Sequence, residues 1–199
     1  MRLVLLSLTP ELMRQRLSDA MDIYLAAMEY DFSWKHNRRR AWYQATFFEG
    51  WKAFGLFDYV DDDSHPDNTP ARAPLVGITY GYRGHGDSWW SEQIRNGMQS
   101  EGLSPQETEQ ILKRYFELSE IHIAPAYQGQ GWGQKMLQRM ENSCHESRII
   151  LSTPECPGEN NAAWHLYRRA NYQDLLRNFY FPGDDRAFGV LIKELRQST

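Results

Sequence analysis

Three glycines lie within five positions of one segment, at Gly129, Gly131 and Gly133. The segment follows an alternating apolar stretch at 118–123 and a break at Pro125, and it precedes an amphipathic stretch. In a strand-to-helix turn without side chains, backbone amides can converge on an anion, and the positive end of the helix dipole favours negative charge there. The spacing therefore predicts an anion site, and a diphosphate is its natural ligand.

A glycine-rich turn has simpler interpretations as well. It can be a flexible connection or a place where a helix and a strand approach closely. The dinucleotide-binding Gly-x-Gly-x-x-Gly spacing and the ATP-binding Gly-x-x-x-x-Gly-Lys-Ser/Thr loop are both absent from this segment. What remains is the pattern Gln-x-x-Gly-x-Gly, which runs from Gln128 to Gly133.

A second patterned segment runs from Asn160 to Tyr172. We expect Asn160 to cap a helix whose apolar face repeats at helical intervals, with Ala163, Leu166, Tyr167 and Ala170. Asn171 follows, and asparagine tolerates the left-handed conformation of a helix C-terminus best after glycine. Taken alone, this segment is also compatible with an ordinary packing helix.

In this order, the strand, Pro125, the glycine turn and the downstream Asn-x-x-Ala-x-x-Leu-Tyr pattern resemble the GNAT superfamily of N-acetyltransferases. The resemblance is specific over residues 116–182 and only topological before them. It implies that the turn holds the pyrophosphate of acetyl-coenzyme A. Asn171 and Tyr172 stand where the family usually has Gly and Phe, and both departures are physically mild.

The resemblance also implies how the cofactor arm is bound. The family splays the motif strand from the next one, so the main chain of Ile121 and Ile123 would bind the pantetheine as an added strand. Trp132 replaces a smaller apolar residue and would pack beneath the helix or touch the adenine. The full predicted set for acetyl-CoA is Ile121, His122, Ile123, Gln128, Gly129, Gln130, Gly131, Trp132, Gly133, Gln134, Asn160, Ala163 and Tyr167.

Amine acetylation defines the catalytic candidates. An alkyl ammonium with a pKa near ~10 must lose a proton before it attacks a thioester, and the departing thiolate needs an acid. The resemblance implies Glu120 as the base, Glu117 as the second choice for it, and Tyr167 as the acid. Alternatives stay open: Glu120 as a salt-bridged strand residue, Tyr167 as a packing aromatic, and His122 as a structural or substrate-lining group or as a base.

The amine itself is not defined by the sequence. The aromatic residues expected near the acceptor suit an apolar or cationic molecule, and at least half of them would be core: Trp34, Trp42, Tyr80, Tyr82, Trp89 and Trp90. The basic run at 35–40 is most simply a solvated helix face, with a cofactor 3'-phosphate or acidic-acceptor site as the alternative.

Composition excludes several classes of protein. The chain has 199 residues, 22 basic and 26 acidic side chains and a net charge of -4, which disfavours a nucleic-acid partner. No apolar run reaches the ~20 residues of a membrane span, and we read residues 3–8 as the first strand. Cys144 and Cys156 lack metal-ligand spacing and suit a reducing cytoplasm. The acidic stretch at 58–67 lacks the central Gly and final Glu of an EF-hand, so it predicts a surface loop and no metal site.

These patterns predict one domain over residues 1–199, of the α/β (α+β) class. We expect a mixed, mostly antiparallel twisted sheet with helices on both faces and a helical insertion, at about 85–114, before the fourth strand. Strands are expected at 3–8, 53–60, 74–83, 116–123, 148–152, 175–181 and 188–195. Helices are expected at 10–28, 33–48, 89–114 with an interruption at 102–105, from the glycine turn to 146, and over the second patterned segment. Ser104, Pro105 and Glu107 form a helix-capping box in that interruption.

The resulting prediction is a cytoplasmic N-acetyltransferase. It moves an acetyl group from acetyl-CoA to a primary amine of a small molecule, peptide or protein by direct attack on the thioester. A non-catalytic acyl-CoA-binding module of the same fold and a transferase of a longer acyl group are the alternatives. Its expected partners are acetyl-CoA and the amine, without nucleic acid or membrane, and a homodimer is left open.

Overall fold

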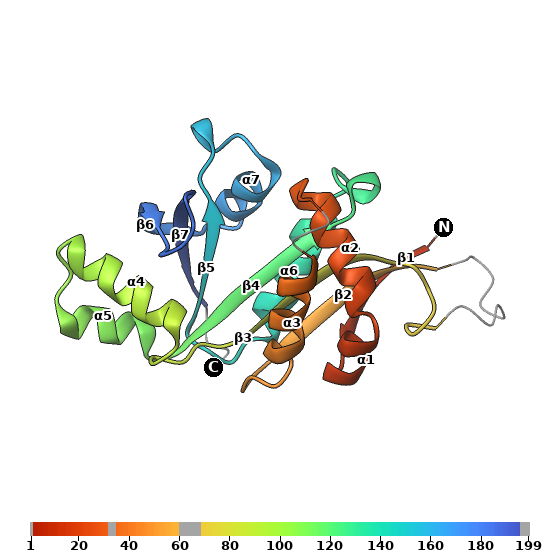
Figure 1. Ribbon diagram of the computed structural model, residues 1–199, viewed down its shortest axis with the longest axis horizontal. Helices are drawn as coiled ribbons and strands as arrows, with labels where there is room; N and C mark the ends of the chain where they lie inside the picture. The colour runs from red at the N-terminus through yellow and green to blue at the C-terminus, as the bar shows by residue number, and fades with distance from the viewer. Residues whose placement is uncertain (1, 32–34, 60–68, 196–199) are drawn as a thin grey trace. The chain divides into compact units, whose positions relative to one another are not determined.

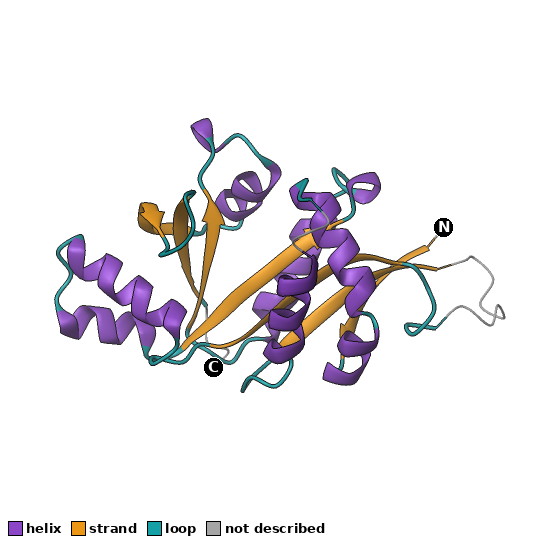
Figure 2. Cartoon of the chain, in the orientation of Figure 1, coloured by secondary structure: helices purple, strands orange, loops and turns teal. Residues whose placement is uncertain are grey.

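The computed structural model describes residues 2–31, 35–59 and 69–195 (Figure 1). The chain folds into two compact units, each of which contains both helices and strands (Figure 2). Unit 1 comprises residues 1–82 and 120–143, and unit 2 comprises residues 83–119 and 144–199. The expectation of one domain over residues 1–199 stays a prediction.

The described residues form a seven-stranded sheet in the order β1-β2-β3-β4-β5-β7-β6. Its strands are β1 (Arg2–Leu8), β2 (Lys52–Tyr59), β3 (Leu75–Arg83), β4 (Tyr115–Ile123), β5 (Arg148–Pro154), β6 (Gln173–Tyr180) and β7 (Ala187–Glu194). The β4–β5 pair is parallel, whereas the β1–β2, β2–β3, β5–β7 and β6–β7 pairs are antiparallel. The predicted mixed, mostly antiparallel sheet is confirmed.

Within the described residues, unit 1 holds β1, β2, β3 as far as Tyr82 and the end of β4, together with four α-helices. These are α1 (Pro10–Gln15), α2 (Leu17–Met28), α3 (Lys35–Ala45) and α6 (Trp132–Ser143). Strand alternation sends one set of side chains, such as Val4 and Leu6, into the core with α1, α2 and α3. The other set, such as Leu3 and Leu5, packs with α6. Helices therefore cover both faces of this part of the sheet, as predicted.

Unit 2 holds the beginning of β4, then β5, β6 and β7, with α4 (Trp89–Ser100), α5 (Pro105–Leu112) and α7 (Ala162–Arg169). The predicted helical insertion before the fourth strand is the α4–α5 pair. Ser104 accepts a bond from the Glu107 amide at 3.3 Å, and the Glu107 carboxylate accepts one from the Ser104 amide at 2.8 Å, so the capping box is confirmed. Ile94, Met98 and Leu112 bury the apolar side of this pair in the core of unit 2.

The predicted helix at 10–28 is wrong in one respect, because it breaks at Arg16. Arg16 has φ -94° and ψ 12° between α1 and α2. Its guanidinium donates to the carbonyl oxygens of Pro70 at 2.6 Å and Ala73 at 2.9 Å, and it pairs with Asp19. Long-range bonds therefore fix Arg16 at the break between the two helices, and local periodicity does not reveal them.

Two other helices are shorter than predicted. The helix expected at 33–48 ends at Ala45, where residues 46–50 form a turn, and its expected start at Ser33 lies outside the described residues. The helix expected to reach residue 146 ends at Ser143. Glu146 is buried and accepts a bond from Arg83 at 3.1 Å, so it belongs to the packing of unit 2.

Candidate active site

Glu120 lies near the end of β4 in unit 1, with its side chain only 12% exposed. The indole N–H of Trp42 donates to its Oε1 at 3.2 Å, and Nε2 of His122 lies 2.7 Å from its Oε2. The backbone carbonyl of Glu120 accepts a bond from the Thr79 hydroxyl at 2.9 Å. The carboxylate is thus held from α3 and from its own strand, in one orientation.

His122 shares the Glu120 face of β4 because strand side chains alternate. Its ring packs edge-on against Tyr24 of α2 at 5.1 Å between centroids and stacks on Trp42 at 6.3 Å. Trp42 also packs edge-on against Tyr80 at 5.0 Å. Aromatic side chains therefore pack around the Glu120–His122 pair. Of the aromatic residues expected near the acceptor, Trp42 and Tyr80 belong to the core, Tyr82 and Trp90 are partly buried, and Trp89 is 55% exposed.

The basic run at 35–40 is not simply a solvated helix face, because Arg38 faces the Glu120–His122 pair. Its guanidinium lies 3.9 Å from Glu120 Oε1 and 5.7 Å from the Tyr24 ring centroid. Burial alone would lower the pKa of Arg38, but the charge of Glu120 and the nearby Tyr24 and Tyr80 outweigh it and raise that pKa. Arg38 stays a cation beside Glu120. Its i, i+4 spacing from Trp42 was the sequence signal for this placement.

The glycine turn has the backbone that an anion site needs. Gly129 has φ +74° and Gly131 φ +80°, a region that residues with side chains rarely adopt, and a Cβ at either position would meet no atom within 4 Å. Glycine is required here for conformation and not for space. The side-chain amide of Gln128 donates to the Ile123 carbonyl at 2.8 Å and ties the turn to the end of β4.

The start of α6 supplies free amides. The Lys135 amide donates to the Gly131 carbonyl at 3.2 Å, which is the first bond of the helix. The amides of Trp132, Gly133 and Gln134 precede it and have no partner within the helix. Trp132 is partly buried against the core shared with α6, and the Lys135 ammonium lies 4.0 Å from its ring centroid.

The edge of β4 offers two further amides. The Ala124 amide donates to the Val76 carbonyl at 2.9 Å, so alternation turns the amides of Ile121 and Ile123 away from β3. The pairing of β4 with β5 covers Tyr115 to Glu117, and neither isoleucine has a β5 partner among the described residues. Both amides thus face away from β3, and their binding of the pantetheine arm stays a prediction.

The second patterned segment forms α7 in unit 2, with one correction. The N-cap is Asn161, whose side chain accepts from the Trp164 amide at 2.9 Å, and not Asn160 as predicted. A turn with left-handed Gly158 and Glu159 precedes the helix and moves its start one residue along the chain. Asn171 has φ +63°, as predicted for the helix end.

The buried face of α7 consists of Trp164 and Tyr167, and the predicted face missed Trp164. The Trp164 indole N–H donates to the Pro154 carbonyl at 2.9 Å, and its ring fills the space at Gly189, where a Cβ would lie 2.5 Å from ring carbon Cη2. Tyr167 is 6% exposed and its ring lies 5.7 Å from that of Tyr172. Ala163 is half-buried beside them.

Glu117, the second choice for the base, is 7% exposed and lies three positions from Glu120, so the two carboxylates face opposite sides of β4. Burial, and then the charge of Glu117, raise the pKa of its neighbour Tyr115. The Tyr115 hydroxyl bonds with Ser91. Glu117 is therefore a buried carboxylate of the unit 2 interior.

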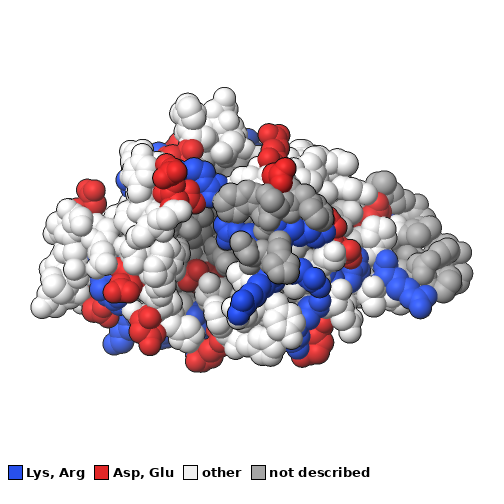
Figure 3. Space-filling view, in the orientation of Figure 1, with Lys and Arg blue, Asp and Glu red and all other residues white. Residues whose placement is uncertain are grey.

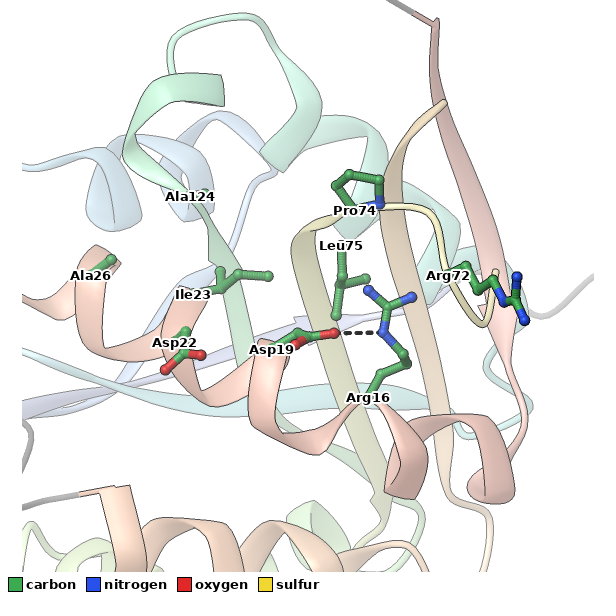
Figure 4. A pocket seen from close by; sticks show the side chains of 9 residues that line it. All are labelled: Arg16, Asp19, Asp22, Ile23, Ala26, Arg72, Pro74, Leu75 and Ala124. Atoms are coloured by element: carbon green, nitrogen blue, oxygen red, sulfur yellow. Dashed lines mark hydrogen bonds and ion pairs between the residues drawn. The ribbon is translucent and has the colours of Figure 1, made fainter. Parts of the chain in front are cut away.

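A hollow of about 520 Å³ lies in unit 1 beside α2 (Figure 4). Figure 4 shows Asp19 and Asp22 on α2 and Arg72 on the loop before β3, and none of the predicted catalytic residues lines the hollow. Arg16 in this hollow is used by Asp19 and two carbonyls, and Asp22 pairs with Lys35. Arg16, Asp19 and Asp22 are thus engaged in structural hydrogen bonds and ion pairs.

The described residues contain no group of three or more His, Cys, Asp or Glu side chains that could hold a metal ion, and no helix with the length and apolar character that crossing a bilayer requires. Neither Cys144 nor Cys156 forms a disulfide bond within the described residues. Most of the acidic stretch at 58–67, like Trp34, lies outside the described residues; Asp58 accepts a bond from the Tyr127 hydroxyl at 2.8 Å.

Known proteins share this sequence pattern and this fold. The model of the acetyltransferase (GNAT) domain matches residues 100–174. A GCN5-like protein acetyltransferase of Mycobacterium tuberculosis is 35% identical over 204 residues, which cover 98% of this chain and 99% of that protein. The chain belongs to the GNAT acetyltransferases. Membership in this family assigns acetyl transfer, in general terms, to the chain.

Solved structures agree with the GNAT fold. The PaiA N-acetyltransferase of Thermoplasma acidophilum, in complex with coenzyme A, has a TM-score of 0.55 at 12% identity, with 98% of this chain and 99% of that chain covered. A protein of Salmonella typhimurium, solved with its cofactor acetyl-CoA, has a TM-score of 0.56 at 15% identity, with 100% and 96% covered. At sequence identities of 12% and 15%, these two structures show a similarity of fold alone.

Proposed function

We propose that this GNAT protein is an N-acetyltransferase that moves the acetyl group of acetyl-CoA to a primary amine. The observation that carries the proposal is the Glu120 carboxylate, which is held by Trp42 and His122 on the strand that leads into the glycine turn. The M. tuberculosis relative is named a protein acetyltransferase, which favours an amine of a protein, such as a lysine side chain, as the acceptor.

The turn and the edge of β4 would bind the cosubstrate. The amides of Trp132, Gly133 and Gln134 would face the pyrophosphate at the positive end of α6. The amides of Ile121 and Ile123 would bond the pantetheine arm as an added strand would. Gln128 would act indirectly, because its side chain holds the turn against the Ile123 carbonyl.

Glu120 would take the proton that the acceptor ammonium must lose, either directly or through a water molecule. The free amine then attacks the thioester carbonyl, so that an N–C bond forms and the C–S bond breaks. The electron pair of the broken bond leaves on sulfur, and Tyr167 would protonate that thiolate. The attacking nitrogen loses its second proton as the amide forms, and that proton would restore the Tyr167 hydroxyl. His122, 2.7 Å from Glu120, would orient the carboxylate and offer a path for the proton to solvent.

The first experiment is calorimetric titration of the protein with acetyl-CoA, followed by release of the free thiol in the presence of a panel of amines. We expect micromolar binding that is lost in Gly131→Glu, whose carboxylate would repel the pyrophosphate. Glu120→Gln is expected to keep the affinity for acetyl-CoA and to lower turnover by ~10²-fold or more.

Tyr167→Phe is expected to behave like Glu120→Gln. If wild-type protein binds acetyl-CoA but turns over no amine, the chain is a binding module and the catalytic proposal fails. If Glu120→Gln turns over at the wild-type rate, the role of Glu120 is wrong.

A further inference from the structure

The α3 helix presents two different faces within unit 1. Trp42 and Ala45 are buried, and Arg38 lies beside Glu120 on the same side. The opposite side and the turn that follows carry exposed arginines and aromatics. We name this set the α3 outer face: Arg39, Arg40, Tyr43, Phe47 and Phe48.

Large aromatic rings are exposed on the α3 outer face. Phe47 is 64% exposed, and Tyr43 and Phe48 are each 46% exposed. Exposed apolar side chains that gather in one place, and do not stand singly, mark interaction surfaces. The rings are also held in place: Tyr43 packs edge-on against Phe47 at 5.6 Å, and Phe48 against Tyr82 at 4.9 Å. A partner would therefore meet a preorganised surface and would pay little entropy to order it.

The charge of the α3 outer face is positive. Arg39 and Arg40 are exposed and have no acidic partner among the described residues. Arg14, which lies over the Phe47 ring at 4.8 Å, is already paired with Glu11. Figure 3 shows Lys and Arg side chains gathered over α3 on the face in view. The chain as a whole carries a net charge of -4, so the positive charge of the α3 outer face is opposite in sign to that of the rest of the protein. A positive surface complements an acidic partner.

The composition of this surface is that of a protein-binding site. Tyr, Phe and Arg are enriched at protein interfaces and carry most of the energy at their centres. Helices that lie on membranes instead combine a strongly apolar face with many lysines and arginines. The α3 helix has eleven residues, and its apolar side is already buried in unit 1. A protein segment is therefore the better occupant.

We propose that the α3 outer face docks an acidic, apolar-containing segment of the protein whose lysine is acetylated. The inference rests on the proposed function, and it names the acceptor by its chemistry. The reason is the position of α3: its inner side holds Arg38 and Trp42 against Glu120. The α3 helix itself separates a segment on the outer side from that pair, so the chain must pass around about half of the helix circumference, roughly 16 Å. About five residues of extended chain span this distance.

The test compares two peptides of equal length, each with one acetylatable lysine. One carries glutamates and leucines around the lysine, and the other carries arginines and serines. A lysine amide without flanking residues serves as the small acceptor. Binding is measured by fluorescence anisotropy of labelled peptides, and turnover by thiol release, at two salt concentrations. The variants are Phe47→Ser and Arg40→Glu.

Two exposed residues of unit 2 supply matched controls. Tyr180→Ser removes an aromatic that is 60% exposed, and Lys113→Glu reverses an exposed charge at the end of α5. We expect the acidic peptide to have a KM at least tenfold below that of the basic peptide, with the difference shrinking as salt rises. Phe47→Ser and Arg40→Glu should raise the KM and Kd for the acidic peptide about tenfold. They should leave kcat and the rate with the lysine amide unchanged, as should both controls.

Equal KM values for the two peptides, or face variants that act no more strongly than their controls, would overturn the docking proposal. So would tighter binding of phosphatidylserine vesicles than of the acidic peptide, if that binding is lost in Phe47→Ser. The anisotropy measurement needs no turnover. Acidic-peptide binding that depends on Phe47, in a protein that acetylates none of the three acceptors, would therefore support the docking face and contradict the proposed activity.

Discussion

The Glu120 carboxylate accepts a hydrogen bond from one neighbouring indole, and the importance of this bond can be tested with a single substitution. Trp42→Phe removes the N–H that donates to Oε1 and keeps an aromatic ring in the core. A hydrogen bond to a charged group is worth about 1.5–3 kcal/mol. We expect kcat to fall by about tenfold or more, with the KM for acetyl-CoA unchanged, in a steady-state thiol-release assay.

Trp51 provides the control for this change. Its indole N–H is buried without a hydrogen-bond partner among the described residues. Trp51→Phe makes the same chemical change but removes no bond, so we expect wild-type kcat. If both variants lose activity equally, the loss reflects general repacking, and Trp42 is not a positioning residue for Glu120.

At the scale of the element, the glycine turn gives the next prediction. Gly131→Ala places its Cβ in open space, so no clash follows, and the cost comes from φ +80°. Forcing a side chain into the left-handed region costs roughly 1–2 kcal/mol. We expect acetyl-CoA to bind about tenfold more weakly in calorimetry, and Gly131→Asn to lose less, because asparagine tolerates this conformation.

Gly102, between α4 and α5, offers the comparison. It has φ +97° and equally open surroundings. Gly102→Ala should lower the unfolding temperature and leave acetyl-CoA affinity unchanged. An equal loss of affinity in the two variants would show that general strain, and not the shape of the turn, determines binding.

Local patterns predicted the elements well where the determining contacts are local. The capping box at Ser104 and the left-handed Asn171 were predicted because a few adjacent residues determine each. The break at Arg16 could not be predicted, since its guanidinium is fixed by carbonyls more than fifty positions away. The cap at Asn161 was missed by one residue because two adjacent asparagines are equally good caps.

In the candidate site, too, some features follow from the local sequence and others from long-range contacts. The strand and the turn were predicted from residue type and spacing, whereas the resemblance to the GNAT family implied Glu120 as the base, a role that stays a prediction. The contacts of Glu120 with Trp42 and Arg38 join residues about eighty positions apart, and they arise only when α3 packs on β4. Tertiary packing therefore determined which member of the basic run faces the site. Of the predicted set, the individual cofactor contacts and the cytoplasmic location stay predictions.

At the scale of the whole molecule, an ion-pair network in unit 2 makes the stability of the fold depend on pH. Arg177 pairs with Glu155 at 2.7 Å and with Glu159 at 2.9 Å, and Arg168 pairs with Glu159 at 2.6 Å. Bonds from Arg177 lower the pKa of Glu155, and bonds from Arg168 lower the pKa of Glu159, from the ordinary value of 4.5.

A lowered pKa in the folded state means that the network stabilises the fold above pH 4.5, and that this stability is lost as the pH falls through the lowered values. Arg177→Gln should therefore unfold at a lower temperature than the wild type at pH 7. The difference should shrink progressively below pH 4.5 in thermal unfolding followed by circular dichroism. A difference that stays constant down to pH 3 would contradict the assignment.

The contact between Trp164 and Gly189 has an evolutionary consequence. The ring occupies the space that any larger residue at 189 would need, since a Cβ there would lie 2.5 Å from it. Gly189 can therefore be replaced only where Trp164 is replaced as well. A relative with a small residue at the Trp164 position is free to carry alanine or valine in place of Gly189, whereas one that keeps the tryptophan is not. Among relatives of this chain, we expect the two positions to covary, and a substitution of Gly189 alone to be purged by selection.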